Sequence, residues 1–272
     1  MINNAKPEKS LIPFFQVDAF SDGPFTGNPA AVCLLEDWHS DATLQSIAKE
    51  NNLSETAFLK KEQDGYSLRW FTPAVEVELC GHATLAAAYV IFEHYQYPGS
   101  KISFHTRSGV LTVRQVDDTL VMDFPAVKPK YIKTPENLIS ALGLNPDVVE
   151  SVLEASDVVV VIKEEAELDS LNPDLNALAK FKTRGVVVTA PSLTYDFRSR
   201  WFGPQVGVNE DPVTGSAYTF LGLYWSERLG KMRLSAAQGG ERKGFLNCAM
   251  EDNGRIALSG KACLIIDGMF HI

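Results

Sequence analysis

The stretch Arg69-Trp70-Phe71-Thr72-Pro73-Ala74-Val75-Glu76-Val77 occurs a second time in the chain, as Arg200-Trp201-Phe202-Gly203-Pro204-Gln205-Val206-Gly207-Val208. The two copies are 131 residues apart, and the same offset relates Leu44-Gln45-Ser46-Ile47-Ala48-Lys49 to Leu175-Asn176-Ala177-Leu178-Ala179-Lys180. This internal duplication predicts two similar domains related by a pseudo-two-fold axis. Since ligand pockets often lie between domains, we expect a binding cleft where the two copies meet.

Between the matched segments the two copies differ in chemistry. Ser54-Glu55-Thr56 of the first copy falls opposite Gly185-Val186-Val187 of the second. A carboxylate that stands where its own repeat has valine should be partly removed from water, as the carboxylate of a general acid/base often is. Alternatively, Glu55 faces outward and pairs with a lysine such as Lys60 or Lys61. The sequence leaves both interpretations open.

Composition predicts a cytoplasmic protein with two ordinary hydrophobic cores. Of the 272 residues, 45% are hydrophobic, which suffices for one large core or two, and the duplication favours two. A net charge of −9 disfavours nucleic acid and anionic membranes as partners. The four cysteines show no paired spacing, which argues against a metal knuckle or a disulfide framework. The polar segment from Met1 to Ser10 has no features of a secretory signal, and no apolar stretch is long enough to span a membrane.

Local patterns predict an α+β fold. A surface helix is expected at 41–50, after Ser40 or Asp41 as the cap, and a short connecting helix from Thr134 to Gly143. Each half also has a mostly apolar helix, at 80–92 and at 214–225, which should be enclosed by other elements. Strands are expected at 14–20, 30–35, 54–59, 66–71, 101–104, 110–114, 120–124, 158–161, 185–189, 198–202, 232–236, 256–258 and 263–266.

These elements predict two pseudo-symmetric β-barrel-like domains, each wrapped around a central buried helix. We expect the first domain to comprise residues 12–130 and the second residues 131–272, with the last strand free to return to the first domain. The offset between the two enclosed helices is 134 residues, so the second copy should have three extra residues just before its helix, in Asn209-Glu210-Asp211.

Both enclosed helices begin with glycine, at Gly81 and at Gly215. Free backbone N–H groups at a helix start attract anions, so the two starts could together hold a carboxylate-bearing ligand. Alternatively, the two glycines only permit close packing at a crowded turn.

Four further side chains near these helix starts are candidates for binding or catalysis. His82, in the first turn, could donate to a substrate or relay a proton, or it could be a satisfied structural group. Asp211 and Ser216 could contact the substrate or cap the second helix, and sequence alone does not separate Asp211 from Glu210. Cys80 could be a thiolate base or a buried structural cysteine. Because its repeat position holds Thr214, a racemase mechanism with two thiols is excluded.

The chain resembles the phenazine-biosynthesis PhzF-like isomerase family. The resemblance rests on motifs in the same order, with a weaker match at Gln238-Gly239: Val17-Asp18-Ala19-Phe20 with Phe25-Thr26-Gly27-Asn28-Pro29-Ala30-Ala31-Val32, Asn52-Leu53-Ser54-Glu55-Thr56-Ala57-Phe58, Phe71-Thr72-Pro73 with Cys80-Gly81-His82-Ala83-Thr84-Leu85, and Glu210-Asp211-Pro212-Val213-Thr214-Gly215-Ser216-Ala217.

This resemblance implies a fold like that of diaminopimelate epimerase, a homodimer, and catalysis without cofactor or metal. It implies that Glu55 is the general acid/base and that His82, Asp211 and Ser216 hold or protonate the substrate. The best-known member moves a proton on a dihydro-hydroxyanthranilate. Two departures, Cys80 before the Gly-His turn and Ala83 after it, suit a broad branch of the family and leave the substrate open.

Three functions remain as hypotheses. The first is an isomerase in which Glu55 moves a proton on a small carboxylic acid, while the helix starts stabilise the developing charge. The second is an epimerase or racemase that uses Cys80 or Glu55 together with Asp211. The third is a catalytically silent protein that binds a small acid. No partner other than a small-molecule carboxylate and a second copy of the chain is expected.

Overall fold

Strand pairing follows one pattern in both halves of the computed structural model, which describes residues 11–272. In each half the successive pairings are antiparallel, parallel, antiparallel, parallel, antiparallel and antiparallel. The first half uses β1 (Leu11–Ala19), β2 (Asn28–Leu35), β3 (Glu55–Glu62), β4 (Gly65–Phe71), β6 (Lys101–Thr106), β7 (Gly109–Val116) and β8 (Thr119–Pro125). The second uses β10 (Val149–Glu154), β11 (Val158–Ile162), β12 (Val186–Pro191), β13 (Phe197–Gly203), β15 (Arg233–Gln238), β16 (Gly244–Glu251) and β17 (Arg255–Gly260).

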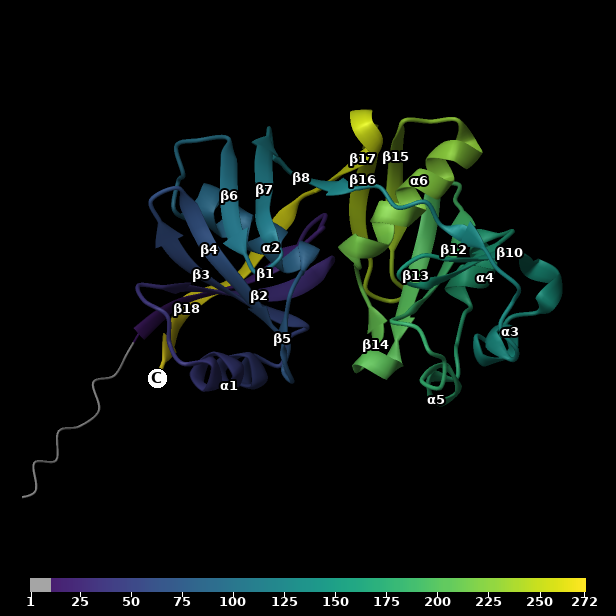
Figure 1. Ribbon diagram of the computed structural model, residues 1–272, viewed down its shortest axis with the longest axis horizontal. Helices are drawn as coiled ribbons and strands as arrows, with labels where there is room; N and C mark the ends of the chain where they lie inside the picture. Colours follow the sequence, from purple (N-terminus) through teal and green to yellow (C-terminus); the bar gives the residue numbers. More distant parts are fainter. Residues whose placement is uncertain (1–10) are drawn as a thin grey trace, which may run out of the picture.

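Each half forms a lobe around one central helix (Figure 1). Helix α2 (Gly81–Tyr89) continues as the π-helical turn η1 (Val90–His94), and its alanines let the surrounding strands approach closely. Helix α6 (Tyr218–Leu229) follows the 3₁₀ turn η4 (Gly215–Ala217). A Cβ at Gly222 of α6 would lie 2.4 Å from Ile256 Cδ1, so any side chain here would have to displace Ile256. Both helices belong to one continuous buried cluster, as their apolar surface predicts.

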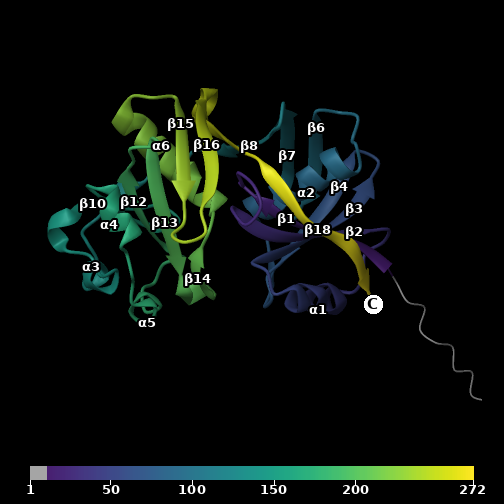
Figure 2. The same ribbon diagram turned by 180° about the vertical axis from the view of Figure 1, so that it is seen from behind.

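The lobes exchange strands. Strand β9 (Lys130–Tyr131) follows β8 of the first lobe and pairs with β10 of the second. Strand β18 (Ala262–His271) follows β17 of the second lobe and runs back to pair with β1 of the first (Figure 2). Strands β8 and β17 also pair with each other. As a division of the chain we propose residues 12–130 together with β18 for the first lobe, and the rest of 131–272 for the second.

The remaining elements are short connections, apart from one surface helix. Helix α1 (Asp41–Asn51) forms as expected, with Ser40 accepting a hydrogen bond from the Thr43 backbone and left-handed Asn52 at its end. The helix expected from Thr134 is shorter, because Asn137 takes a positive φ of 62° and α3 spans only Leu138–Ala141. The others are β5 (Glu76–Val77), η2 (Pro146–Val148), α4 (Glu165–Asp169), α5 (Leu175–Leu178), η3 (Pro204–Val206), β14 (Val208–Asp211) and η5 (Asp252–Gly254).

The strand register corrects the position of the three extra residues in the second copy. Trp70 pairs with Val77, and its repeat equivalent Trp201 pairs with Asp211. The extra residues therefore lie before Glu210, in the turn around η3, and not in Asn209-Glu210-Asp211. Asp211 is the counterpart of Val77, which is a second place where one copy has a carboxylate and the other has valine.

None of the helices within residues 11–272 has the length and apolar character needed to cross a membrane. The expectation that Met1 to Ser10 is not a secretory signal concerns residues outside those described.

Candidate active site

A cavity of about 500 Å³ lies where the two lobes meet, and both copies contribute its walls. The start of α2 and the 3₁₀ turn η4 that precedes α6 both reach it: a Cβ on Gly81 would lie 3.8 Å from Gly215 Cα, an ordinary contact distance. Crowding at this contact is therefore not severe enough to require glycine. The second α-helix itself begins at Tyr218 and not, as expected, at Gly215. The predicted site residues that line the cavity are Glu55, Cys80, Gly81, His82, Asp211, Gly215 and Ser216.

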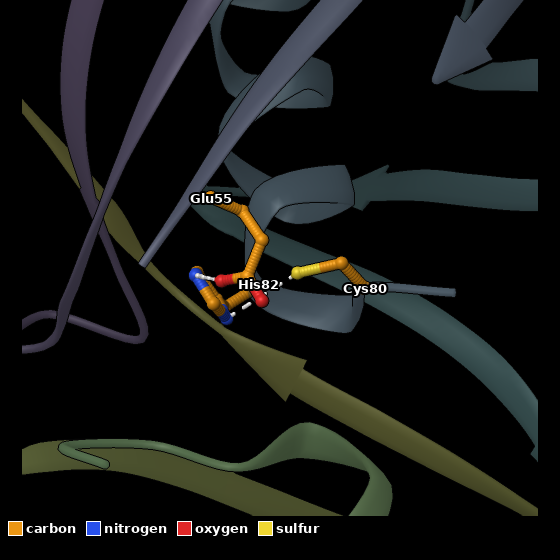
Figure 3. A group of neighbouring side chains, drawn as sticks. All are labelled: Glu55, Cys80 and His82. Atoms are coloured by element: carbon orange, nitrogen blue, oxygen red, sulfur yellow. Dashed lines mark hydrogen bonds and ion pairs between the residues drawn. The ribbon is translucent and has the colours of Figure 1, made fainter. Parts of the chain in front are cut away.

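Glu55 and His82 meet on the first-lobe side of the cavity (Figure 3). Glu55 is the first residue of β3, and its Oε2 lies 3.2 Å from Nε2 of His82 in the first turn of α2. The side chains are 18% and 6% exposed. Glu55 therefore points inward, and the alternative partner Lys60 pairs instead with Asp37 at 3.2 Å. Among the described residues, neither Glu55 Oε2 nor His82 Nε2 has a hydrogen-bond partner, so their contact is an ion pair.

Asp211 lies on the other side of His82, and the amide nitrogen of Asn28 contacts both. The Asn28 amide donates to Asp211 Oδ1 at 2.7 Å and to the Val213 carbonyl at 3.0 Å, and it lies 3.3 Å from His82 Nδ1. The Thr214 hydroxyl donates to Asp211 Oδ2 at 2.6 Å. Within residues 11–272 these side chains are the hydrogen-bond donors to the Asp211 carboxylate, so it does not cap the second helix.

The surroundings of Asp211 and His82 shift the pKa values of both side chains. Burial, together with the nearby Glu55 charge, raises the pKa of Asp211 to about 6, although His82 and the donors Thr214 and Asn28 act in the opposite direction. Burial alone would lower the pKa of His82, but Cys80 and Glu55 outweigh it, and the pKa of His82 lies well above the ordinary value. Asp211 can thus gain or lose a proton near neutral pH, and His82 favours its charged form.

Cys80 lines the cavity and contacts His82, but its surroundings do not favour the reactive thiolate form. Its Sγ lies 3.6 Å from His82 Nδ1, and burial raises the pKa of the thiol. Glu55, Cys80 and His82 offer donor atoms within 4.8 Å of one another, close enough to consider a metal ion. His82 presents Nε2 to Glu55 and Nδ1 to Cys80, so the carboxylate and the thiol lie beside different ring nitrogens. A zinc ion instead needs one atom from each ligand around a shared centre.

The structure separates Asp211 from its neighbour Glu210. Glu210 accepts two hydrogen bonds of 2.8 Å from Arg200, whose Nη1 also donates to the carbonyls of Leu168 and Leu171. Successive strand residues point to opposite faces, so only one of the two acids can reach the cavity.

Three residues of this site were not predicted. Asn28 lies in a quoted motif, but its partners are distant in sequence. Thr214 was noted only as the counterpart of Cys80. Arg184, which donates to Ser216 Oγ at 2.8 Å, lines the second-lobe side of the cavity. The repeat alignment could have revealed Arg184, because it replaces Leu53, two residues before the substitution of Glu55 by Val186.

Comparisons of the chain with known proteins identify its family. Residues 17–268 match the model of the phenazine biosynthesis-like protein family. An uncharacterized isomerase of Pseudomonas aeruginosa is 53% identical over 96% of this chain and 99% of its own. A crystal structure of a PhzF-family phenazine biosynthesis protein from Enterococcus faecalis superposes with a TM-score of 0.93 at 41% identity, covering 97% of this chain and 100% of that one.

A more distant structure shares the fold alone. It is a predicted epimerase of Pseudomonas aeruginosa, with a TM-score of 0.75 and 22% identity over 95% of this chain and 99% of that one. These matches confirm the expected α+β fold of two barrel-like units around central helices. The chain therefore belongs to the phenazine biosynthesis-like protein family and is an isomerase.

Proposed function

We propose that the protein is a cofactor-independent isomerase that moves a proton on a small carboxylic acid, with Glu55 as the general acid/base. The observation that carries this proposal is the position of the Glu55 carboxylate. It is partly withdrawn from water at the cavity wall and lies 3.2 Å from buried His82. A base in such a place can remove a proton from carbon if the resulting charge is stabilised nearby.

In the proposed step, Glu55 takes a proton from a carbon conjugated with the substrate carboxyl group. The electron pair of the broken C–H bond moves into the conjugated system, and negative charge develops on the carboxyl oxygens. The N–H groups at the start of α2 lie at the cavity and can stabilise this charge. Return of the proton to a different carbon completes the isomerisation with no net change in atoms or electrons.

His82 and Asp211 have supporting roles in this proposal. Charged His82 forms an ion pair with Glu55 Oε2, which orients the carboxylate for proton transfer. Asp211, with a pKa of about 6, is a second group able to exchange protons near neutral pH. Apolar side chains on the remaining walls suit the body of a small, flat acid: Val75, Val77, Leu79, Phe124, Trp201, Val206 and Val208.

Proton exchange in heavy water tests the proposal. Wild type and Glu55→Gln are incubated with dihydro-hydroxyanthranilate and a panel of cyclic and amino acids, and deuterium uptake is read by mass spectrometry. We expect uptake with wild type and its loss in the variant. Glu62→Gln, at the far exposed end of the same strand, is the matched control and should behave as wild type. Equal uptake by wild type and Glu55→Gln would remove Glu55 from the mechanism.

An epimerase is the second candidate, and the position of Asp211 favours it. Inversion at carbon needs a base on each face, and Asp211 and Glu55 approach His82 from different lobes. Single-enantiomer amino acids distinguish the two functions: an epimerase yields the labelled opposite enantiomer, whereas an isomerase yields a shifted double bond. A protein that binds acids but exchanges no proton with any of them would be the silent binder.

The homodimer and the cytoplasmic location stay predictions. Light scattering on the purified chain tests the first, and fractionation of the producing cell tests the second.

A further inference from the structure

We propose that Arg184 is the specificity-determining residue that binds the carboxylate of the substrate, on the second-lobe side of the cavity. This inference rests on the proposed function, because it concerns the acid on which Glu55 would act. Arg184 precedes β12 by two positions, as Leu53 precedes β3. The two equivalent strand starts thus bring a cation from one copy and a carboxylate from the other to one cavity. Among the described residues that line the cavity, Arg184 is the only arginine or lysine.

The guanidinium is held in place before any ligand binds. Its Nε donates to Asp157 Oδ1 at 2.8 Å and its Nη2 to Asp157 Oδ2 at 2.5 Å. The Asp157 side chain is fully buried and accepts a third hydrogen bond, from Trp201 Nε1 at 3.1 Å. The guanidinium carbon of Arg184 also lies 5.8 Å from the centre of the Trp201 ring. Such fixing lowers the entropy cost of binding a ligand.

Two donors of Arg184 are left for a ligand. A guanidinium has five N–H groups, and within residues 11–272 three of them go to Asp157 and Ser216. One N–H remains on each terminal nitrogen, which is enough to donate to both oxygens of a carboxylate. Ser216 accepts from Arg184, so its own hydroxyl is free to donate to the same anion.

The chemistry of these free groups identifies the ligand group. A guanidinium donates and cannot accept, so the group that it recognises must be an acceptor. The negative charge of Asp157 offsets the positive charge of Arg184, so recognition depends mainly on paired hydrogen bonds and less on long-range attraction. A planar carboxylate fits this requirement, and a neutral amide offers only one acceptor oxygen.

Calorimetric titration with anthranilate and its neutral analogue anthranilamide tests the assignment. Arg184→Gln should weaken anthranilate binding roughly 10- to 100-fold, the range for charge-assisted hydrogen bonds. Anthranilamide binding should change by less than about threefold. The matched control is Arg228→Gln. Arg228 likewise pairs with a carboxylate, that of Glu150, and lies over the Trp225 ring at 5.2 Å, but it does not line the cavity.

A second variant guards against misfolding, because Arg184→Gln leaves the buried Asp157 charge without its cation. Asp157→Asn combined with Arg184→Gln removes both charges and should show the same selective loss with a wild-type circular dichroism spectrum. Unchanged anthranilate affinity, an equal loss for both probes, or no binding of anthranilate to wild type at millimolar concentration would each overturn the assignment.

The same titration separates this inference from the proposed function. Glu55→Gln should bind anthranilate as wild type does while losing proton exchange. If Arg184→Gln keeps its affinity but Glu55→Gln loses exchange, the role of Arg184 fails and the isomerase stands. If the selective loss occurs but no acid exchanges a proton, Arg184 binds the anion and the isomerase proposal fails.

Discussion

The two copies of the repeat keep the same ion pair but differ at the cavity they share. Arg69 donates two hydrogen bonds to Glu76, as Arg200 does to Glu210, and each guanidinium carbon lies 5.1 Å from the ring of the following phenylalanine. At and beside the cavity, five aligned positions of the two copies differ in chemistry, although Gly81 and Gly215 are the same residue. The five differing pairs are Leu53 and Arg184, Glu55 and Val186, Val77 and Asp211, Cys80 and Thr214, and His82 and Ser216.

This difference shows how a symmetric scaffold can hold an asymmetric site. Equivalent strands and helices with the same backbone arrangement lie on both sides of the cavity. Their side chains differ, so each copy supplies different functional groups. The first copy supplies the proposed base and its histidine, and the second supplies a cation and an acid with a pKa of about 6. Substitutions that give one copy the residue found at the equivalent position of the other copy test whether the two copies have these separate roles.

The largest effect is expected when the first copy is given the residue of the second. Glu55→Val should reduce proton exchange by about 10²- to 10⁴-fold, the usual contribution of a general acid/base. Deuterium uptake in heavy water measures the loss, and Glu55→Gln, which keeps the shape of the side chain, should match it. Exchange that survives in both variants would assign the base to another residue.

Removing the acid from each equivalent ion pair should affect stability unequally. Glu210→Gln should lower the free energy of unfolding by about 3 kcal/mol, because the buried guanidinium of Arg200 then loses its anionic partner. Glu76→Gln should cost only about 1 kcal/mol, because Arg69 keeps Asp41 at 2.9 Å. Urea denaturation of the two variants measures both, and equal losses would show that Asp41 does not compensate.

Asp211 should make stability depend on pH in a way that valine at position 77 cannot. Its folded-state pKa of about 6 lies above the ordinary value of 3.8, so its stabilising contribution is complete below about pH 4 and is lost as pH rises through about 6. Relative to Asp211→Asn, wild type should lose on the order of 2 kcal/mol across this window. Denaturation of both proteins at about pH 4 and about pH 8 measures the change. A pH-independent difference would mean that His82 fully compensates the Asp211 charge in the folded state.

The smallest effect is expected at Cys80. Cys80→Thr, which copies Thr214, should change proton exchange by less than about tenfold, because a buried thiol with a raised pKa is a poor base. Thermal unfolding checks that the variant folds. Complete loss of exchange in a folded variant would instead favour the thiol-dependent epimerase.

The duplicated sequence predicts the scaffold well because the same periodic pattern occurs twice. It also makes Glu55 a candidate, since the repeat supplies valine as an internal reference. The same comparison does not show whether Asp211 or Glu210 is the functional acid. The three extra residues of the second copy leave open which of the two corresponds to Val77 in the repeat alignment. Only the pairing of Trp201 with Asp211 settles the register.

Contacts distant in sequence were beyond prediction. Asn28 joins His82 and Asp211 only because β2, α2 and β14 meet at the junction of the lobes. Strands β10 and β16 were missed as well. Strand β16 begins at Gly244 and contains exposed Asn247, so its apolar alternation is weak, and its place is set by neighbouring strands.

The exchange of strands has a consequence for how the protein is made. Leu11, near the start of the first lobe, pairs with His271, so the sheet of that lobe is complete only after almost the whole chain has been synthesised. During translation the edge of β1 that later pairs with β18 stays unpaired while the second lobe is synthesised. An exposed strand edge of this kind can pair with other chains and lead to aggregation. Strand β9, which pairs with β10 of the second lobe, is synthesised before β10 itself. The second lobe therefore does not depend on β18, the last strand of the chain, to complete its own pairing. The order of synthesis thus favours completion of the C-terminal lobe first.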